Sequence, residues 1–437
     1  MGRAFCVAVG YAQAGRLKHF ELPLSEPKTP GSYDRSVPLE RTLALVPELR
    51  RRYCITRVAD TTRLDRTEIP TVSAVVPHSD LLSVFNGKGR TREAAIASAV
   101  MEAVERQIMA DPPVRTHHLS VRQICQHLDL DALGLLPEVK NTVAECVYGT
   151  DLLDGSIVSV PMQLVACPWY GERLFRGTHS NGIASGNTLA EATYHALAEL
   201  VERHVWSLFV IRSELVPRFY RGRNAQDEVV AKALAFPTGD AYLDELSVRI
   251  SAAGLSMRVM LLQEVALPLV ALATIVEPHS SPPMAHQGMG CALSPAYAIG
   301  RAITEAVQSR VVDIAGARDD LLRPNDPPRM TGEHARRASR LPENRWYYGL
   351  PAETLALSDL NDPSTDDLAG DLRFLLQALR ASQHDRIVAV DLSPAGLPIA
   401  AVRIVAPSLE NYFNMERIGA RGIALFNPFH LLGDSYG

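Results

Sequence analysis

The sequence of 437 residues has few cysteines, and none of them form a close pair. Its six cysteines are scattered without a CxxC motif, which excludes a zinc ribbon or a thioredoxin-type redox site. Scattered thiols are typical of a reducing compartment, so we expect a cytoplasmic protein. Long apolar runs are also missing. The longest, Ala266–Val276, contains Pro268 and predicts a buried strand, with no signal peptide and no membrane span.

An excess of positive charge is absent as well. The 44 Lys and Arg residues are outnumbered by 49 Asp and Glu residues, which gives a net charge of −5 and excludes a dedicated nucleic-acid binder. Several catalytic motifs are missing, namely the GxxxxGK[ST] P-loop, the GxSxG elbow and the HExxH zinc motif. The composition, with 47% hydrophobic and 21% charged residues, is that of an ordinary globular protein.

Helical and strand patterns alternate along the chain, which predicts a mixed α/β fold. The predicted helices cover residues 91–108, 189–209, 295–315 and 368–381, and residues 42–49 form an apolar-periodic stretch. The predicted strands cover residues 71–77, 157–165, 255–262, 267–276, 386–391 and 399–406. Glycines predict a turn at residues 87–89, and a Ser/Pro/Gly-rich composition predicts a loop at residues 277–290.

No linker is polar enough to mark a clean domain boundary. We therefore expect an N-terminal segment, residues 1–50, followed by one fused unit over residues 51–437. Within that unit, residues 113–150 predict a polar excursion with one short helix, and residues 317–345, which lack clear periodicity, predict a surface excursion.

Three of the predicted helices carry related sequences: SAVMEAVER at residues 98–106, HALAELVER at 195–203 and the weaker AITEAVQSR at 302–310. Their aligned acidic positions hold Glu102, Glu199 and Glu305, followed three residues later by Glu105, Glu202 and Gln308. Alanines precede each first glutamate by three and by seven residues, and glycines precede each helix. We interpret the copies as structural units whose helices meet around one site.

The spacing places carboxylates on a small-residue face of each helix. Ser98, Glu102 and Glu105 form one ridge, because residues three and four apart are helix neighbours. Glu191, His195, Glu199 and Glu202 form another. Buried carboxylates are costly unless they are paired or bind a metal, and Mg²⁺ prefers oxygen ligands. A single ExxER motif is usually a solvated helix face, but three related copies in one chain favour a metal site, with Arg106 and Arg203 nearby as fixed positive charges.

These motifs resemble those of the YcaO family from about Tyr33 to the end of the chain. The resemblance rests on residues 86–106, 180–204, 300–310 and 402–410, and the segment 54–70 is similar to members found in natural-product clusters. It implies a YcaO fold in which the three related helices surround one ATP site without a P-loop. It also implies ATP- and Mg²⁺-dependent O-phosphorylation of a backbone amide in a ribosomally made precursor peptide.

The resemblance also assigns roles by motif position. The metal ligands it implies are Glu102, Glu105, Glu191, Glu199, Glu202 and Glu305. The residues that the resemblance implies for catalysis are Glu199, Glu202, Arg203 and Glu305. Further nucleotide contacts are implied at Arg35, Thr42, Ser98, Asn187, Glu191 and Arg301.

The reaction product is less constrained than the use of ATP. Azoline-forming members end in a PxPxP tail, whereas residues 426–437 contain only Pro428, and no fused peptide-clamping domain is recognisable. We therefore expect a thioamide, formed with a separate sulfur-delivery or leader-binding protein; a homodimer is one assembly the chain could form. The alternatives are a macroamidine- or azoline-forming enzyme and a non-catalytic docking scaffold, although six retained glutamates argue against the scaffold.

Overall fold

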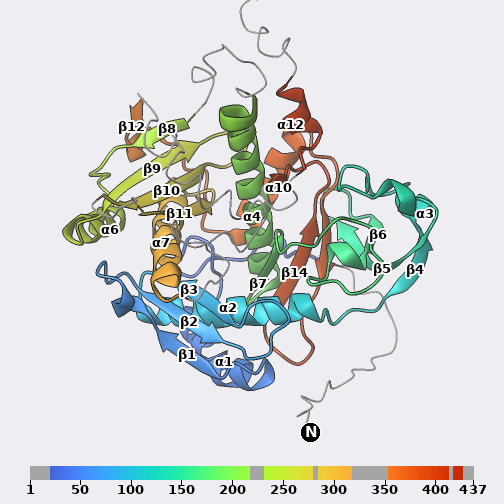
Figure 1. Cartoon of the computed structure of the whole chain (residues 1–437), viewed down its shortest axis with the longest axis horizontal. Coiled ribbons are helices and arrows are strands. Elements are labelled where there is room, and N and C mark those ends of the chain that lie inside the picture. The colour runs from blue at the N-terminus through green and yellow to red at the C-terminus, as the bar shows by residue number, and fades with distance from the viewer. Residues whose placement is uncertain (1–19, 217–230, 279–283, 317–352, 413–416, 427–437) are drawn as a thin grey trace, which may run out of the picture.

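The structure, a computed structural model, describes residues 20–216, 231–278, 284–316, 353–412 and 417–426. Helices and strands build three sheets in these residues (Figure 1). The smallest is an antiparallel sheet of β1 (Arg57–Asp60), β2 (Thr71–Val75) and β3 (Val84–Lys88). The mixed α/β class predicted from the sequence is confirmed.

The second sheet has the order β11-β10-β9-β8-β12. Its strands are β8 (Ala231–Leu234), β9 (Ser256–Leu262), β10 (Val270–Glu277), β11 (Met284–Cys291) and β12 (Thr354–Leu355). The third sheet has the order β4-β5-β13-β14-β7, with β6 paired to β5. Its strands are β4 (His117–Ser120), β5 (Val143–Asp151), β6 (Ile157–Pro161), β7 (Ile183–Gly186), β13 (Val388–Asp391) and β14 (Ala400–Val405).

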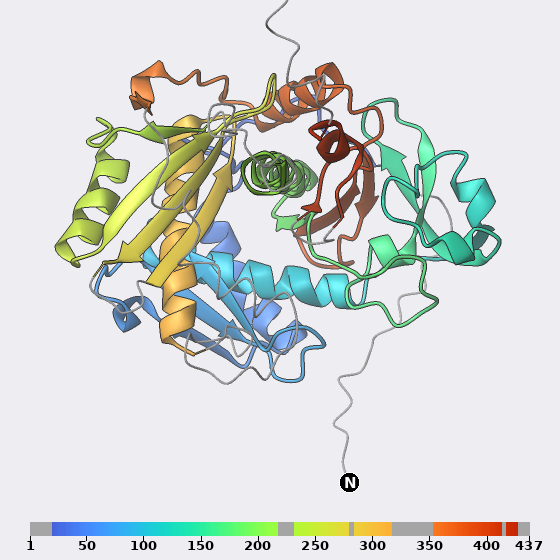
Figure 2. The ribbon, with the colours of Figure 1, turned by 45° about the horizontal axis from the view of Figure 1, so that its top comes forward.

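Helix α4 (Leu189–Val210) lies at the centre of the molecule. Figure 2 shows it nearly end-on, between the second sheet and strands β7 and β14 of the third. Most of its residues are buried, because apolar side chains cover more than one face and pack on both sheets. A buried helix exposes few polar groups to water, so any carboxylate on it needs a specific partner.

Seven more described helices surround this centre. They are α1 (Leu39–Arg52), α2 (Arg92–Ala110), α3 (Val121–Ile124), α6 (Ala241–Ala252), α7 (Pro295–Ile314), α10 (Leu368–Ala381) and α12 (Ala420–Ala424). The long helices lie where apolar periodicity predicts them. Helices α2 and α4 begin at matching caps: the Thr91 hydroxyl accepts from Ala94 N, and the Thr188 hydroxyl accepts from Glu191 N.

Among the glycines before the related helices, Gly87, Gly186, Gly288 and Gly290 lie in strands. This corrects the predicted turn at residues 87–89 in part, since β3 extends to Lys88, and it corrects the second half of the predicted loop at residues 277–290. A Cβ atom on Gly87 would lie 2.2 Å from Ala99 N, and one on Gly288 would lie 2.2 Å from Ala306 N. These glycines therefore let a strand backbone touch a helix backbone, which a side chain would prevent. Turn prediction fails here because close packing demands the same residue as chain reversal.

The predicted excursion at residues 113–150 contains β4, α3 and most of β5, which belong to the third sheet. The predicted excursion at residues 317–345 lies outside the described residues. Helix α1 runs across residue 50, and the division of the chain at that residue stays a prediction.

Candidate active site

The related helices α2, α4 and α7 bring their glutamates into one cluster at the centre of the molecule. Charge interactions connect the first helix with the other two, since Glu105 interacts with Glu199 and Glu102 interacts with Glu305. Glu202 completes the cluster beside Glu305 and Glu199. We call Glu102, Glu105, Glu199, Glu202 and Glu305 the glutamate cluster.

Burial gives the carboxylates of the glutamate cluster a poorer environment for negative charge than water, although cationic side chains lie beside them. Burial raises the pKa of Glu105 to about 8, although Arg106 opposes the shift. Burial also raises the pKa of Glu202 to about 7, and the charge of Glu305 adds to the rise while Arg203 opposes it. Carboxyl groups with raised pKa values gain from any added positive charge. The cluster is therefore suited to bind a cation.

Strand β7 and the turn before it fix two of these carboxylates. The backbone N–H of Ser185 donates to Glu105 Oε2 at 3.0 Å, and that of Gly182 donates to Glu199 Oε1 at 3.2 Å. Since each bond occupies one carboxylate oxygen, the second oxygen of each group is left for other ligands. Ser98, one turn before Glu102 on α2, is half-buried.

Half-buried arginine side chains border the cluster on α2, α4 and α7. Arg203 Nη2 lies 3.5 Å from Glu202 Oε1, and Arg106 lies 3.8 Å from Glu105. Arg106 Nη1 and Arg301 Nε are buried without a hydrogen-bond partner among the described residues. Buried donors without acceptors are costly, so these atoms favour an anionic ligand such as phosphate.

The predicted N-terminal contacts also come together, at the start of α4. The Thr42 hydroxyl donates to Asn187 Oδ1 at 2.9 Å, and Arg35 Nη1 lies 3.5 Å from Glu191 Oε2. Helix α1 and the segment before it are thereby held against α4. The structure places Arg35, Thr42, Asn187 and Glu191 in one group.

Glu191 differs from the glutamate cluster, because the protein already uses both of its oxygens. Oε1 accepts from the backbone N–H groups of Ser36 and Val37 at 2.9 and 3.1 Å. Oε2 accepts from the Asn187 N–H at 2.9 Å, and the side chain is fully buried. These bonds and Arg35 lower the pKa of Glu191 against the effect of burial. Glu191 therefore joins the N-terminal segment to α4 through hydrogen bonds.

Sequence reasoning missed a second polar group beside Arg35. Asp34 is 2% exposed, accepts from the Tyr297 hydroxyl at 2.8 Å and lies 2.9 Å from His195 Nε2. Tyr33 stacks on Tyr297 with ring centroids 5.0 Å apart. Asp34 and Tyr33 lie outside any periodic segment, so only their adjacency to Arg35 hints at a role.

Lys88 is another residue that sequence reasoning left aside. Its Nζ lies 2.8 Å from Glu305 Oε2, and this contact lowers the pKa of Glu305 against the effect of burial. The available signal was a lysine between two glycines just before a related helix. It does not form a P-loop, so the pattern alone carried little weight.

The described residues fit a metal-bridged polyphosphate better than a metal alone. No three His, Cys, Asp or Glu side chains in the described residues converge closely enough to enclose a metal ion. Mg²⁺ rarely needs such a cage, because it keeps water and takes phosphate oxygens as ligands. The cluster holds carboxylates that would suit a bound metal, and Arg106 and Arg301 hold N–H groups without partners in the described residues that would suit phosphate oxygens.

The chain belongs to the YcaO family. The sequence model of the family described as YcaO cyclodehydratase, ATP- and Mg²⁺-binding, matches residues 86–410. A protein of Methanothermobacter thermautotrophicus, named as uncharacterized, is 32% identical over 84% of this chain and 93% of its own length. A protein of Rhizobium leguminosarum bv. trifolii, named as uncharacterized and lying in the tfuA 3′ region, is 32% identical over 91% of this chain and 92% of its own length.

Solved structures share the fold. The YcaO protein from Methanopyrus kandleri, bound with AMPPCP and Mg²⁺, matches with a TM-score of 0.64 and 23% identity over 88% of this chain and 95% of that one. A heterocyclase in complex with substrate and cofactor matches with a TM-score of 0.72 and 18% identity, over 95% of this chain and 57% of that one. The predicted family and fold are thus confirmed, and ATP and Mg²⁺ are the cofactors that the family description names.

No helix among the described residues is long and apolar enough to span a lipid bilayer.

Proposed function

We propose that this protein uses ATP and Mg²⁺ to O-phosphorylate a backbone amide in a ribosomally made precursor peptide. One observation carries the proposal: glutamates from three related helices converge beside buried guanidinium donors that lack partners. That arrangement matches the needs of a metal-bound triphosphate and stands in a chain of an ATP- and Mg²⁺-binding family.

The glutamate cluster is the proposed Mg²⁺-binding set. Glu199, Glu202, Glu305 and Arg203 are the residues proposed to act on the transferring phosphoryl group. We leave Glu191 out of the metal set, because backbone N–H groups occupy its oxygens. Its proposed role is to hold the N-terminal segment at the nucleotide.

The remaining nucleotide contacts are proposed to be Arg35, Thr42, Ser98, Asn187 and Arg301. Helix α7 indicates how the nucleotide would lie along the site. Tyr297, Arg301 and Glu305 follow one another at intervals of four residues on one face of this helix. At 1.5 Å per residue they span about 12 Å, enough for an extended nucleoside triphosphate. The stacked rings of Tyr33 and Tyr297 would receive the base, and Glu305 would lie at the metal end.

An amide oxygen is a poor leaving group, and bound Mg²⁺–ATP supplies the phosphoryl group that makes it a good one. The protein holds the amide and the nucleotide in one place, which makes the step effectively unimolecular. Its arginines balance the charge that shifts toward the phosphate oxygens during transfer. Glu202, which is 5% exposed, marks the part of the cluster from which water is most excluded, and water would otherwise compete as the acceptor.

The proposed product is a thioamide, made with a separate sulfur-delivery protein. The segment 54–70 supports this choice through its similarity to members from natural-product clusters. Azoline or macroamidine formation is the alternative, which the fold shared with a heterocyclase keeps open. The protein partner and a homodimer stay predictions.

Product analysis tests the proposed phosphorylation. The full chain is incubated with Mg²⁺, ATP and the precursor peptide encoded beside its gene, with and without neighbouring proteins. We expect ADP and phosphate in proportion to modified peptide, because direct transfer removes only the γ-phosphate. AMP as the main nucleotide product would instead indicate adenylation and contradict the proposal.

A further inference from the structure

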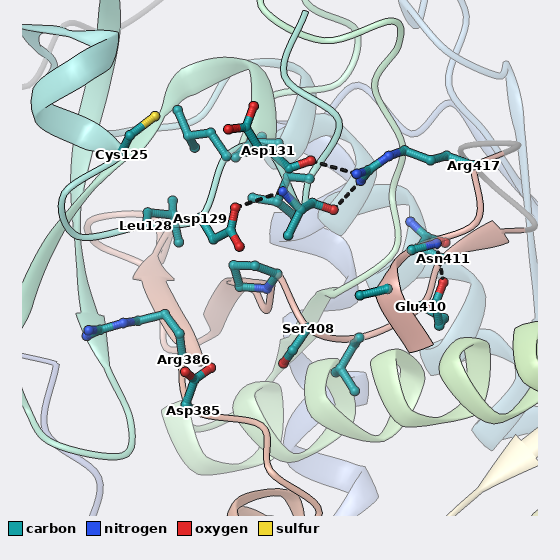
Figure 3. A pocket seen from close by; sticks show the side chains of 18 of the residues that line it. Cys125, Leu128, Asp129, Asp131, Asp385, Arg386, Ser408, Glu410, Asn411 and Arg417 are labelled. Carbon is teal, nitrogen blue, oxygen red and sulfur yellow. Dashed lines mark hydrogen bonds between the residues drawn. The ribbon is translucent and has the colours of Figure 1, made fainter. Parts of the chain in front are cut away.

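A cleft of about 600 Å³ lies on the side of the molecule where the third sheet meets α12. Its walls come from the segment after α3, the end of β14 and the turn before α12. Figure 3 shows side chains of these segments around it, among them Cys125, Asp131, Ser408 and Arg417. The volume is typical of pockets that bind ligands.

The lining of the cleft is polar but balanced in charge. Four acidic and four arginine side chains line it. Many are already bonded within the protein: Glu410 accepts from the Gly419 and Gly422 N–H groups at 2.7 and 2.8 Å. Arg417 donates to the carbonyl oxygens of Asp131 and Ala132. A lining without net positive charge does not favour a polyphosphate, but it suits a peptide backbone, which is polar and neutral.

One buried side chain connects the cleft with the glutamate cluster. Arg403 is 3% exposed, lines the cleft and donates from Nε to the Leu164 carbonyl at 2.8 Å. Its charge also interacts with those of Glu199 and Glu105. Arg403 stands on β14 opposite Ile183 of β7, the strand whose Ser185 N–H binds Glu105, so this residue lies where the cleft and the glutamate cluster adjoin.

Arg403 keeps one donor unused. Its Nη2 lies 3.5 Å from His179 Nδ1, while its Nη1 is buried without a hydrogen-bond partner in the described structure. Burial lowers the pKa of His179 to about 3, and the neighbouring Arg403 contributes to this shift, so the imidazole is neutral and can accept. A buried N–H without an acceptor is costly, which favours a ligand that brings a carbonyl oxygen.

We propose that this cleft binds the stretch of substrate peptide next to the amide to be modified, with Arg403 Nη1 donating to a peptide carbonyl oxygen. The proposal rests on the proposed function, since it assigns the path by which a peptide reaches the glutamate cluster. Arg403 is then a substrate-binding residue.

The test uses Cys125, which lines the cleft and is exposed, whereas the other described cysteines are partly or fully buried. The full chain is labelled with N-phenylmaleimide, and a Cys125→Ser variant receives the same treatment as the control. Both are mixed with Mg²⁺, AMPPCP and a library of N-acetylated, C-amidated octapeptides, and bound peptides are counted by mass spectrometry. We expect labelling at Cys125 to reduce peptide retention at least tenfold, while the treated control retains peptides as the untreated protein does.

An Arg403→Lys variant should show the same loss, because lysine keeps the charge without the fork of donors. Equal retention after labelling of Cys125, or no retention by untreated protein, overturns the inference. Calorimetry with Mg²⁺ and AMPPCP on the same samples separates the two claims. Failure to bind AMPPCP contradicts the proposed function. Normal AMPPCP binding, together with peptide retention that is unaffected by labelling at Cys125 or by Arg403→Lys, contradicts only this inference. Loss of AMPPCP binding on labelling would assign the cleft to the nucleotide and overturn it too.

Discussion

At the residue scale, burial decides how each ionisable group behaves. Glu105 and Glu202 are buried among like charges and have raised pKa values, whereas Glu191 is buried among donors and has a lowered one. The same residue type therefore has a raised pKa in one place and joins two segments of the chain in another. Sequence spacing predicts that the carboxylates gather, but it does not predict which donors reach them.

His384 gives a prediction about pH. It is fully buried, and burial together with Arg421 lowers its pKa to about 4. Its pKa in the unfolded chain is higher, about 6.5, so the unfolded state takes up a proton first as the pH falls. The free energy of unfolding should therefore decrease between about pH 6.5 and 4, with a slope of up to about 1.4 kcal/mol per pH unit from this group.

Urea unfolding at a series of pH values, on the natural protein and a His384→Gln variant, measures that slope. The variant should lose less stability between pH 6.5 and 4.5, because glutamine does not titrate. Parallel pH profiles of the two proteins would show that His384 does not couple to folding.

At the element scale, the structure repeats one motif three times: a strand with glycine, followed by a helix with alanines and glutamates. Apolar periodicity predicts α2, α4 and α7, because it depends only on the helix itself. The sequence predicts a turn and a loop where the structure has strands β3 and β11. The prediction fails because the glycines of these strands are required by contact with a helix backbone, which short sequence patterns do not reveal. The sequence also does not predict the contacts of Asp34 and Lys88, because these contacts join segments that are distant in the sequence.

The close contact between strand and helix can be tested at Gly87. We expect Gly87→Ala to destabilise the protein by about 1–3 kcal/mol or more, because the new methyl group would overlap the backbone of Ala99. Gly177→Ala is the matched control, since no atom lies within 4 Å of its added Cβ. Denaturant midpoints measure both. A Gly87→Ala variant as stable as the control would contradict the described packing.

At the scale of the whole molecule, contacts distant in sequence hold the N-terminal segment on the body. Lys28 Nζ lies 2.5 Å from Asp371 Oδ2 on α10, with side chains 5% and 0% exposed. We expect Asp371→Asn to cost about 3–5 kcal/mol, because it leaves a buried ammonium group without its counter-ion. Glu353→Gln removes the partner of Lys232 in an exposed pair and should cost less than about 1 kcal/mol.

Thermal and denaturant unfolding compare these two variants. Equal stability would mean that the Lys28–Asp371 pair contributes no more than a surface pair.

The chemistry of the product also belongs to the whole molecule and its partners. Intact-mass spectrometry of the precursor peptide, after incubation with ATP, Mg²⁺, a sulfide source and the partner protein, distinguishes the routes. Replacement of oxygen by sulfur adds about 16 Da, whereas azoline or amidine formation removes about 18 Da, because cyclisation expels water while an external nucleophile leaves the chain open. Loss of water without sulfide would reject the thioamide and leave ATP-dependent amide activation in place.

The central claim is that the glutamate cluster binds a metal-bound nucleotide, and calorimetric titration with AMPPCP in the presence of Mg²⁺ tests it most directly. Glu202→Gln removes a buried cluster carboxylate, while Glu245→Gln changes an exposed glutamate on α6 and serves as the control. We predict that Glu202→Gln weakens AMPPCP binding at least tenfold, about 1.4 kcal/mol, while both variants keep the natural fold by circular dichroism. Unchanged AMPPCP affinity in the folded Glu202→Gln variant would contradict the account.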